Sequence, residues 1–260
     1  ALPPAVAQER VDQQLQLHFP PINSAQDEDS RLKALSVFDA LRTLLTQLHC
    51  SEGKEAIFLG GIFSYDLIAS VEQLPSVVES PRNDCPDFCF YVAETLIHID
   101  HRKQQTQVQT LTFGGEQFAQ EHARLQQRQQ QLQELCNHFV PPALPDALPL
   151  DGKLTTNRSD QAFCEDVERL KGHIFKGDIF QVVPSRCFSL PCPQPLLAYR
   201  QLKKTNPSPY MFYVNDQDFT LFGASPESAV KFTANTRQVE MYPIAGTRRR
   251  GFNPDGTINL

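Results

Sequence analysis

Apolar residues recur every seven positions in a glutamine-rich stretch from about residue 116 to residue 139. The residues with this spacing are Phe118, Leu125, Leu132 and Phe139. Seven residues make about two helical turns, so the spacing predicts a long amphipathic helix. The intervening turns carry Glu121, Arg128 and Gln129, where a coiled coil would need apolar side chains. We therefore expect this helix to dock on a sheet rather than to dimerise.

Upstream of this helix, β-branched and aromatic residues gather in two segments, 88–101 and 106–113, which predicts a pair of strands. A third apolar segment, 56–69, predicts a buried strand that Gly60 and Gly61 interrupt. The first half of the chain is therefore expected to mix helices and strands.

Prolines mark the clearest boundary in the chain. They stand at positions 141, 142, 145 and 149. Each proline fixes its own backbone and disfavours helix in the residue before it. We predict a linker over 141–150, an N-terminal α+β part over 1–140 and a second domain over 151–260.

The second domain is expected to begin with a helix and to continue with strands. Ser159 or Asp160 can cap the helix, and Gly177 can end it. Its apolar positions on one face are Phe163, Val167, Leu170 and Ile174. The strand segments that follow are 210–214, 219–224, 229–234 and 238–245. Turn residues separate them, so the pattern predicts an antiparallel meander.

Composition limits the class of function. The chain has 260 residues, 40% of them hydrophobic, and a net charge of -6, which argues against nucleic acid or an anionic membrane as a partner. No apolar run approaches the ~20 residues that span a bilayer, and the first residues lack the pattern of a secretory signal. We therefore expect a cytoplasmic protein. One basic cluster, 248–250, is either a solvated turn or a site for an anion.

Seven cysteines, an odd number, are scattered through the chain. This usage favours reduced thiols in a reducing compartment over a disulfide framework. Cys85, Cys89, His98 and His101 could be drawn as a zinc site, but the spacing of the two cysteines is unusual and His98 lies within a predicted strand. We interpret these residues as ordinary thiols and strand histidines.

Four short blocks follow one another between Lys176 and Gly251: KGDIFQVVPSR, NPSPYMFY, LFGASPES and YPIAGTRRRG. None would identify a protein alone, but four in this order do not readily arise by chance. They resemble the chorismate-utilising enzymes, and among these the large subunits of anthranilate synthases. The resemblance implies an α+β fold with two packed, largely antiparallel β-sheets and outer helices. It also implies that the chain is a fragment lacking the N-terminal and C-terminal parts of such a subunit.

Glu227 follows a run of small residues, 223–226, at the end of an apolar strand, which leaves room for a ligand beside the carboxylate. Most glutamates at turns are solvated and have no such role. In the family, this glutamate lines the chorismate pocket and is proposed to protonate the departing ring hydroxyl. The resemblance therefore implies a general acid, whose pKa would have to be raised by burial.

Gln181 and Ala245 separate the family members. Water-using relatives carry a lysine base at the position of Gln181, and aminodeoxychorismate synthases usually carry a lysine nucleophile at the position of Ala245. Without either lysine, the resemblance implies direct attack by ammonia, with Gln181 and Glu227 in the catalytic site. Gly246 and Thr247 are then expected to contact the substrate through a backbone N–H and a hydroxyl. By themselves they would predict only a glycine turn after a strand.

The block NPSPYMFY alternates turn formers with aromatic residues, and by itself it predicts the start of an edge strand. In anthranilate synthases it helps to build the feedback site for tryptophan, and Pro209, Tyr210 and Met211 are the positions that carry over. A surface of proline, aromatic ring and methionine suits an indole ring. The family's second motif for this site, a Leu-Leu-Glu-Ser run, is not found in this sequence.

The resemblance implies a lyase of tryptophan biosynthesis that converts chorismate and ammonia to anthranilate and pyruvate, with Mg2+ as cofactor. Ammonia would come from glutamine through an amidotransferase subunit, and L-tryptophan would inhibit. The family's metal-binding glutamates match no residue before Leu260, so no metal ligand is assigned and the chain alone is expected to be inactive. Two alternatives stay open: component I of an aminodeoxychorismate synthase, and a non-catalytic, truncated binding module.

Overall fold

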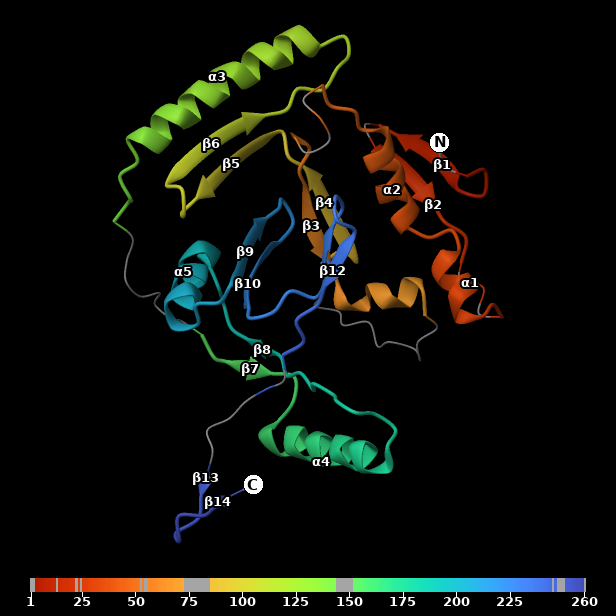
Figure 1. Ribbon diagram of the computed structural model, residues 1–260, viewed down its shortest axis with the longest axis vertical. Coiled ribbons are helices and arrows are strands. Elements are labelled where there is room, and N and C mark those ends of the chain that lie inside the picture. The colour runs from red at the N-terminus through yellow and green to blue at the C-terminus, as the bar shows by residue number, and fades with distance from the viewer. Residues whose placement is uncertain are drawn as a thin grey trace. The chain divides into compact units, whose positions relative to one another are not determined.

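The computed structural model describes residues 3–12, 14–21, 23, 25–51, 53, 56–72, 85–143, 152–244, 246 and 251–259. The chain divides into two compact units, Ala1–Pro141 and Pro142–Leu260. Figure 1 shows the elements of both units. Most of the predicted linker, 144–150, lies outside the described residues.

The first unit contains helices and antiparallel strand pairs. Its elements are β1 (Ala7–Val11), β2 (Gln14–His18), α1 (Glu28–Lys33), α2 (Phe38–Gln47), β3 (Leu59–Phe63), the 3-10 helix η2 (Tyr65–Ser70), β4 (Phe88–Val92), β5 (Thr95–Asp100), β6 (Gln105–Thr110) and α3 (Phe118–Asn137). β1 pairs with β2, β3 with β4, and β5 with β6, each time antiparallel.

The second unit has the same character. Its elements are β7 (Thr155–Thr156), α4 (Asp160–Lys176), β8 (Phe188–Ser189), α5 (Pro195–Thr205), β9 (Tyr210–Asn215), β10 (Thr220–Ser225), β11 (Lys231–Thr233), β12 (Gln238–Glu240), β13 (Gly251–Phe252) and β14 (Ile258–Asn259). β7 pairs with β8, β9 with β10, β11 with β12, and β13 with β14, all antiparallel. The predicted α+β class with antiparallel strands is confirmed, and the sheets among the described residues are strand pairs.

β3 runs through Gly60 and Gly61, the glycines that were expected to interrupt it. A Cβ atom on Gly61 would lie 2.2 Å from the carbonyl O of Cys89 and 2.6 Å from the ring of Phe90. The bare glycine therefore makes room for the close approach of β4. The prediction of an interrupted, buried strand was wrong on both counts, since β3 continues to Phe63 and that side chain is 53% exposed.

The predicted amphipathic helix is α3, and it packs on β6 (Figure 1). Leu125, one helical turn before Gln129, is only 2% exposed. The side-chain amide of Gln129 donates a hydrogen bond of 2.9 Å to the carbonyl O of Val108 on β6. Arg124 forms an ion pair with Glu94, just before β5. Docking on a sheet is thereby confirmed.

α4 begins and ends where the sequence predicts. The hydroxyl of Ser159 accepts a hydrogen bond of 3.2 Å from the N–H of Ala162, which caps the first turn. Gly177 has a φ of 81°, the left-handed conformation that ends helices. The N–H of Asp178 then bonds back to the carbonyl O of His173 at 3.0 Å. Both predicted caps are confirmed.

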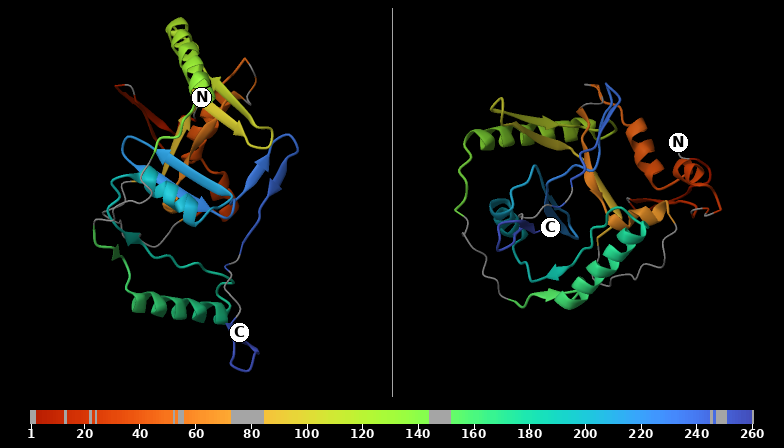
Figure 2. Two further views of the ribbon diagram at one scale, coloured as in Figure 1. Left: turned by 90° about the vertical axis from the view of Figure 1, so that its left-hand side faces the viewer. Right: turned by 60° about the horizontal axis from the view of Figure 1, so that its bottom comes forward.

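The two predicted strand pairs after α5 are also confirmed, and α5 lies against β10 (Figure 2). The predicted meander is not continuous, because no ladder joins β10 to β11 within the described part of the chain. β10 ends at Ser225, and Pro226 follows. Proline has no N–H to donate to a neighbouring strand, so the ladder stops there.

Candidate functional site

An aromatic cluster fixes the hairpin that carries Glu227. Tyr199 of α5 lies with its ring centroid 5.5 Å from that of Tyr213 on β9 and 6.0 Å from that of Phe222 on β10. The Tyr213 and Phe222 rings stack with their centroids 6.1 Å apart. Aromatic pairs at these distances stabilise beyond their burial. The helix and both strands are therefore joined close to the catalytic candidate.

The other face of the hairpin is held by a close contact across the strands. Gly223 lies opposite Phe212, and a Cβ atom on Gly223 would come within 2.6 Å of the Phe212 ring. The ring therefore lies directly over the glycine backbone. This contact accounts for one of the small residues before Glu227, because a side chain at position 223 would collide with the Phe212 ring.

Ser225 holds the backbone of Glu227 at the end of the hairpin. The Ser225 hydroxyl donates to the carbonyl O of Glu227 at 2.8 Å and accepts from the Glu227 N–H at 3.3 Å. Glu227 is half-buried. The structure thus gives the predicted acid a fixed backbone and partial shelter from solvent.

The residues of the predicted tryptophan site lie at the same end of this hairpin. In the β9–β10 register, Tyr210 is opposite Ser225 and Met211 is opposite Ala224. Side chains at directly opposed positions have Cβ atoms about 4.5–5.5 Å apart. Met211 is half-buried, Tyr210 is 49% exposed, and Pro209 is exposed at the start of the strand. A ligand on this surface would therefore lie close to the turn that carries the acid.

Gln181 lies in the irregular segment that follows α4, and it is exposed. At the start of this segment, Nδ1 of His173 and a carboxylate oxygen of Asp178 lie 2.8 Å apart across the helix end. No hydrogen bond joins Gln181 to Glu227 in the portion of the chain that the structure describes. The two catalytic candidates are not brought together by the contacts seen here.

Arg186 ends the same sequence block, and the sequence pattern gave no sign of its contacts. Its guanidinium forms an ion pair of 2.6 Å with Asp160 and donates from Nε to the carbonyl O of Arg158 at 2.9 Å. It also lies 4.8 Å above the ring of Phe188. Arg186 therefore ties the start of α4 to β8, the strand that follows the segment carrying Gln181.

The second pair of substrate candidates is only partly described. Gly246 is exposed, and among the described residues no atom lies within 4 Å of the position where its Cβ would stand, its own atoms and those of its two chain neighbours set aside. Thr247, Ala245 and the basic cluster 248–250 lie outside the described residues. The predicted contacts of Gly246 and Thr247 with substrate stay predictions.

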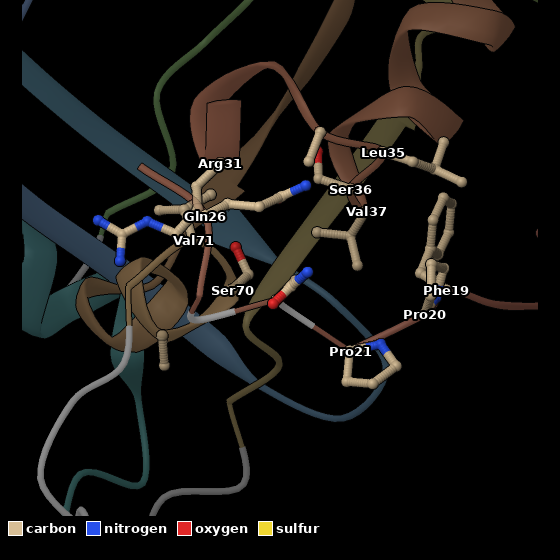
Figure 3. Close-up of a pocket in the computed structure, with 13 residues that line it drawn as sticks. Phe19, Pro20, Pro21, Gln26, Arg31, Leu35, Ser36, Val37, Ser70 and Val71 are labelled. Carbon is tan, nitrogen blue, oxygen red and sulfur yellow. The ribbon is translucent and has the colours of Figure 1, made fainter. Parts of the chain in front are cut away.

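Two of the cavities are lined by residues of the first unit, and none of the predicted site residues is among those lining residues. One has a volume of about 500 Å³, and Phe19, Val37, Arg31 and Ser70 are among its lining residues (Figure 3). Nε of Arg31 and the Ser70 hydroxyl are buried there without a hydrogen-bond partner among the described residues. The other, of about 650 Å³, lies between β6, α3 and the segment around Cys50.

A magnesium site does not fit the described residues, because they contain no group of three or more His, Cys, Asp or Glu side chains that could hold a metal ion. The four residues of the zinc alternative are among those described. The free thiols of the described residues include Cys50, Cys89, Cys136, Cys164, Cys187 and Cys192. Within the described ranges, no helix is both long enough and apolar enough to cross a membrane.

Comparison with known proteins places the whole chain in one family. The family described as chorismate binding enzyme matches residues 4–258. Anthranilate synthase component 1 of Serratia marcescens is 51% identical over 100% of this chain and 49% of its own length. The protein of the same name from Escherichia coli (strain K12) is 50% identical, again over 100% of this chain and 49% of its own length. The chain therefore spans about half the length of the curated relatives it matches.

A solved structure shows the same fold. The crystal structure of anthranilate synthase component I from Streptococcus pneumoniae TIGR4 aligns with a TM-score of 0.56 at 24% identity, over 90% of this chain and 51% of that one. All four sequence blocks, and the hairpin that joins Tyr210 to Ser225, fall inside the range that the family matches. The chain belongs to the chorismate-binding enzyme family.

Proposed function

We propose that this chain is part of component 1 of an anthranilate synthase, a lyase of tryptophan biosynthesis that acts on chorismate. The observation that carries the proposal is the match along the whole chain, at 51% and 50% identity, to proteins of that name. Because the chain spans about half of those relatives, the proposed catalyst is the complete subunit.

The proposed reaction joins one molecule of ammonia to one of chorismate. The nitrogen forms a bond to ring carbon 2, and the hydroxyl on carbon 4 leaves as water. The enolpyruvyl group is then eliminated as pyruvate, which leaves the aromatic ring of anthranilate. Glu227 supplies the proton that lets the hydroxyl leave as water, and its half-buried position at the hairpin end supports this role.

The remaining residues of the proposed site exclude competing chemistry and bind substrate. Gln181 and Ala245 offer neither a base to activate water nor an amine to attack the ring, so ammonia is the nucleophile. The N–H of Gly246 and the hydroxyl of Thr247 bind the substrate's oxygens. Mg2+ would neutralise charge on the substrate when bound. The described residues of this chain offer no set of ligands for it.

The proposal includes a partner, an inhibitor and a cellular location. A glutamine amidotransferase subunit supplies ammonia, and L-tryptophan inhibits by binding at Pro209, Tyr210 and Met211. The register of β9 and β10 supports this inhibitor site, because it sets Tyr210 opposite the residue that holds Glu227. A cytoplasmic location agrees with the free thiols among the described residues.

The direct test is turnover by the complete subunit. Purified enzyme with chorismate, an ammonium salt and Mg2+ is expected to form anthranilate, which fluorescence detects, and added L-tryptophan is expected to slow it. The 260-residue chain assayed alone is expected to give no turnover. Accumulation of 4-amino-4-deoxychorismate would favour the aminodeoxychorismate synthase alternative instead. Absence of any product from the complete subunit would reject the proposal.

A further inference from the structure

We propose that Ser225 is a positioning residue for the general acid. Its hydroxyl sets the direction in which the Glu227 side chain projects from the end of the hairpin. The inference rests on the proposed function, because it takes Glu227 as the proton donor to the departing hydroxyl of chorismate. It gives Ser225 no contact with the substrate.

Ser225 is the last residue of a well-anchored strand. It is half-buried and lies opposite Tyr210 at the end of the β9–β10 ladder. The rest of the hairpin is fixed on one face by the aromatic cluster and on the other by the Phe212 ring over Gly223. The position of Ser225 is therefore determined by the fold before any ligand binds.

Strand pairing alone does not fix the backbone of Glu227, because Pro226 lies between Ser225 and Glu227. Pro226 has no N–H and cannot continue the pairing. The Ser225 hydroxyl spans the proline and bonds both the N–H and the carbonyl O of Glu227, at 3.3 Å and 2.8 Å. These are the only hydrogen bonds that Glu227 makes within the described part of the chain. Holding both backbone groups of one residue fixes its backbone angles, and hence the direction of its Cα–Cβ bond.

Three variants of the complete subunit test this role by kinetics. Ser225→Ala removes both hydrogen bonds and is expected to lower kcat roughly 10-fold with little change in KM, because the acid is misplaced while chorismate binding remains. Ser225→Thr keeps a hydroxyl and is expected to recover most of the loss. Thr220→Val is the matched control, since it removes a hydroxyl that bonds Asn215 at 2.9 Å at the far end of the same strand. Its kcat should equal that of the wild type.

A double variant separates positioning from a general loss of structure. In the Glu227→Gln background, Ser225→Ala is expected to cost little more, because the carboxylic acid to be positioned is gone. An equal loss of kcat in both backgrounds, or no loss in Ser225→Ala alone, would overturn the proposal.

Hydrogen exchange gives a readout that needs no turnover. The Glu227 N–H loses its acceptor in Ser225→Ala, so peptides that contain residue 227 are expected to exchange faster than in the wild type or in Thr220→Val. Unchanged exchange would overturn the positioning role even in an active enzyme. Failure of the wild type to make anthranilate would instead reject the proposed function, so the two failures are distinct.

Discussion

Two hairpins of the molecule each pack against a helix, but the side-chain contacts between hairpin and helix differ in kind. The β5–β6 hairpin holds the 20-residue helix α3 through one buried leucine, Leu125, and polar links such as that from Gln129 to β6. The β9–β10 hairpin holds the 11-residue helix α5 through three aromatic rings, of Tyr199, Tyr213 and Phe222. The shorter helix is therefore held by contacts between aromatic rings, whereas the longer helix combines a buried leucine with polar links.

The difference in these contacts corresponds to the segment that follows each hairpin in the chain. β6 leads back into its own helix, and no predicted site residue lies on β5, β6 or α3. β10 leads to Glu227, and the residue paired with its last position is Tyr210 of the proposed inhibitor surface. A side chain that must donate a proton needs a backbone that does not shift, whereas a purely structural helix tolerates polar contacts. The comparison thus predicts that changes on the first hairpin affect stability and changes on the second affect turnover or inhibition.

The largest effect on stability is expected from Leu125→Ala. Leu125 is 2% exposed, and truncation of a buried leucine costs about 2–5 kcal/mol. Leu135→Ala is the matched control on the same helix, because Leu135 is 56% exposed and its loss should cost little. Urea unfolding of the chain measures both. Equal losses would mean that α3 is not held through Leu125.

Glu227→Gln is expected to lower kcat of the complete subunit about 10²-fold or more, the usual contribution of a positioned general acid, with chorismate binding nearly unchanged. Glu94→Gln on the other hairpin is the control, since Glu94 pairs only with structural partners such as Arg124 among the described residues. Its kcat should not change. An unaltered turnover number in Glu227→Gln would give Glu227 a structural role.

Met211→Thr is expected to weaken inhibition by L-tryptophan while sparing turnover without inhibitor. Removal of apolar contact of this size costs on the order of 1–3 kcal/mol, or roughly 5- to 150-fold in affinity. Coupling is reciprocal, so tryptophan should also perturb chorismate binding less. Ile97→Thr makes the same kind of change on the other hairpin, at a side chain that is 41% exposed, and should leave inhibition intact. Superimposable inhibition curves for Met211→Thr and wild type would remove the inhibitor site from β9.

The smallest effect is expected from Gln129→Ala. It removes one hydrogen bond of 2.9 Å to the carbonyl O of Val108, and such a bond contributes about 1 kcal/mol. Gln130→Ala, at the exposed neighbouring position, controls for the change in helix propensity. Urea unfolding of the two variants should differ by that amount, with kcat unchanged in the complete subunit. A marked loss of turnover in Gln129→Ala would show that the first hairpin also serves the site.

Local chemistry made part of the fold predictable from the sequence. The ends of α4 depend on a serine three residues before the N–H it caps and on a glycine at the last turn. The turn between β9 and β10 and the register beside it are likewise set by nearby residues. The course of β3 was not predictable, because Gly61 is explained only by a strand that arrives later in the chain, at Cys89 and Phe90.

The candidate site likewise has features that the sequence predicts and features that it does not. Resemblance in four blocks singled out Glu227, and the small residues before it were interpreted as room for a ligand, whereas the space beside Gly223 is taken by the Phe212 ring. The hold of Ser225 on Glu227 was not visible, since a serine before a proline gives no sign of which backbone groups its hydroxyl will bond. Arg186 was missed because it bonds the carbonyl of Arg158, 28 residues earlier. The periodic patterns of helices and strands do not reveal contacts between residues so far apart in the sequence.

Gly61 also constrains how this protein can vary over evolution. Even a methyl group at this position would collide with the backbone of β4, which cannot move aside as a flexible side chain could. Relief by sliding the strands one residue would turn every side chain of β3 to the opposite face. A substitution at Gly61 would therefore require compensating changes in both β3 and β4. We expect residues of the two strands to change together during evolution.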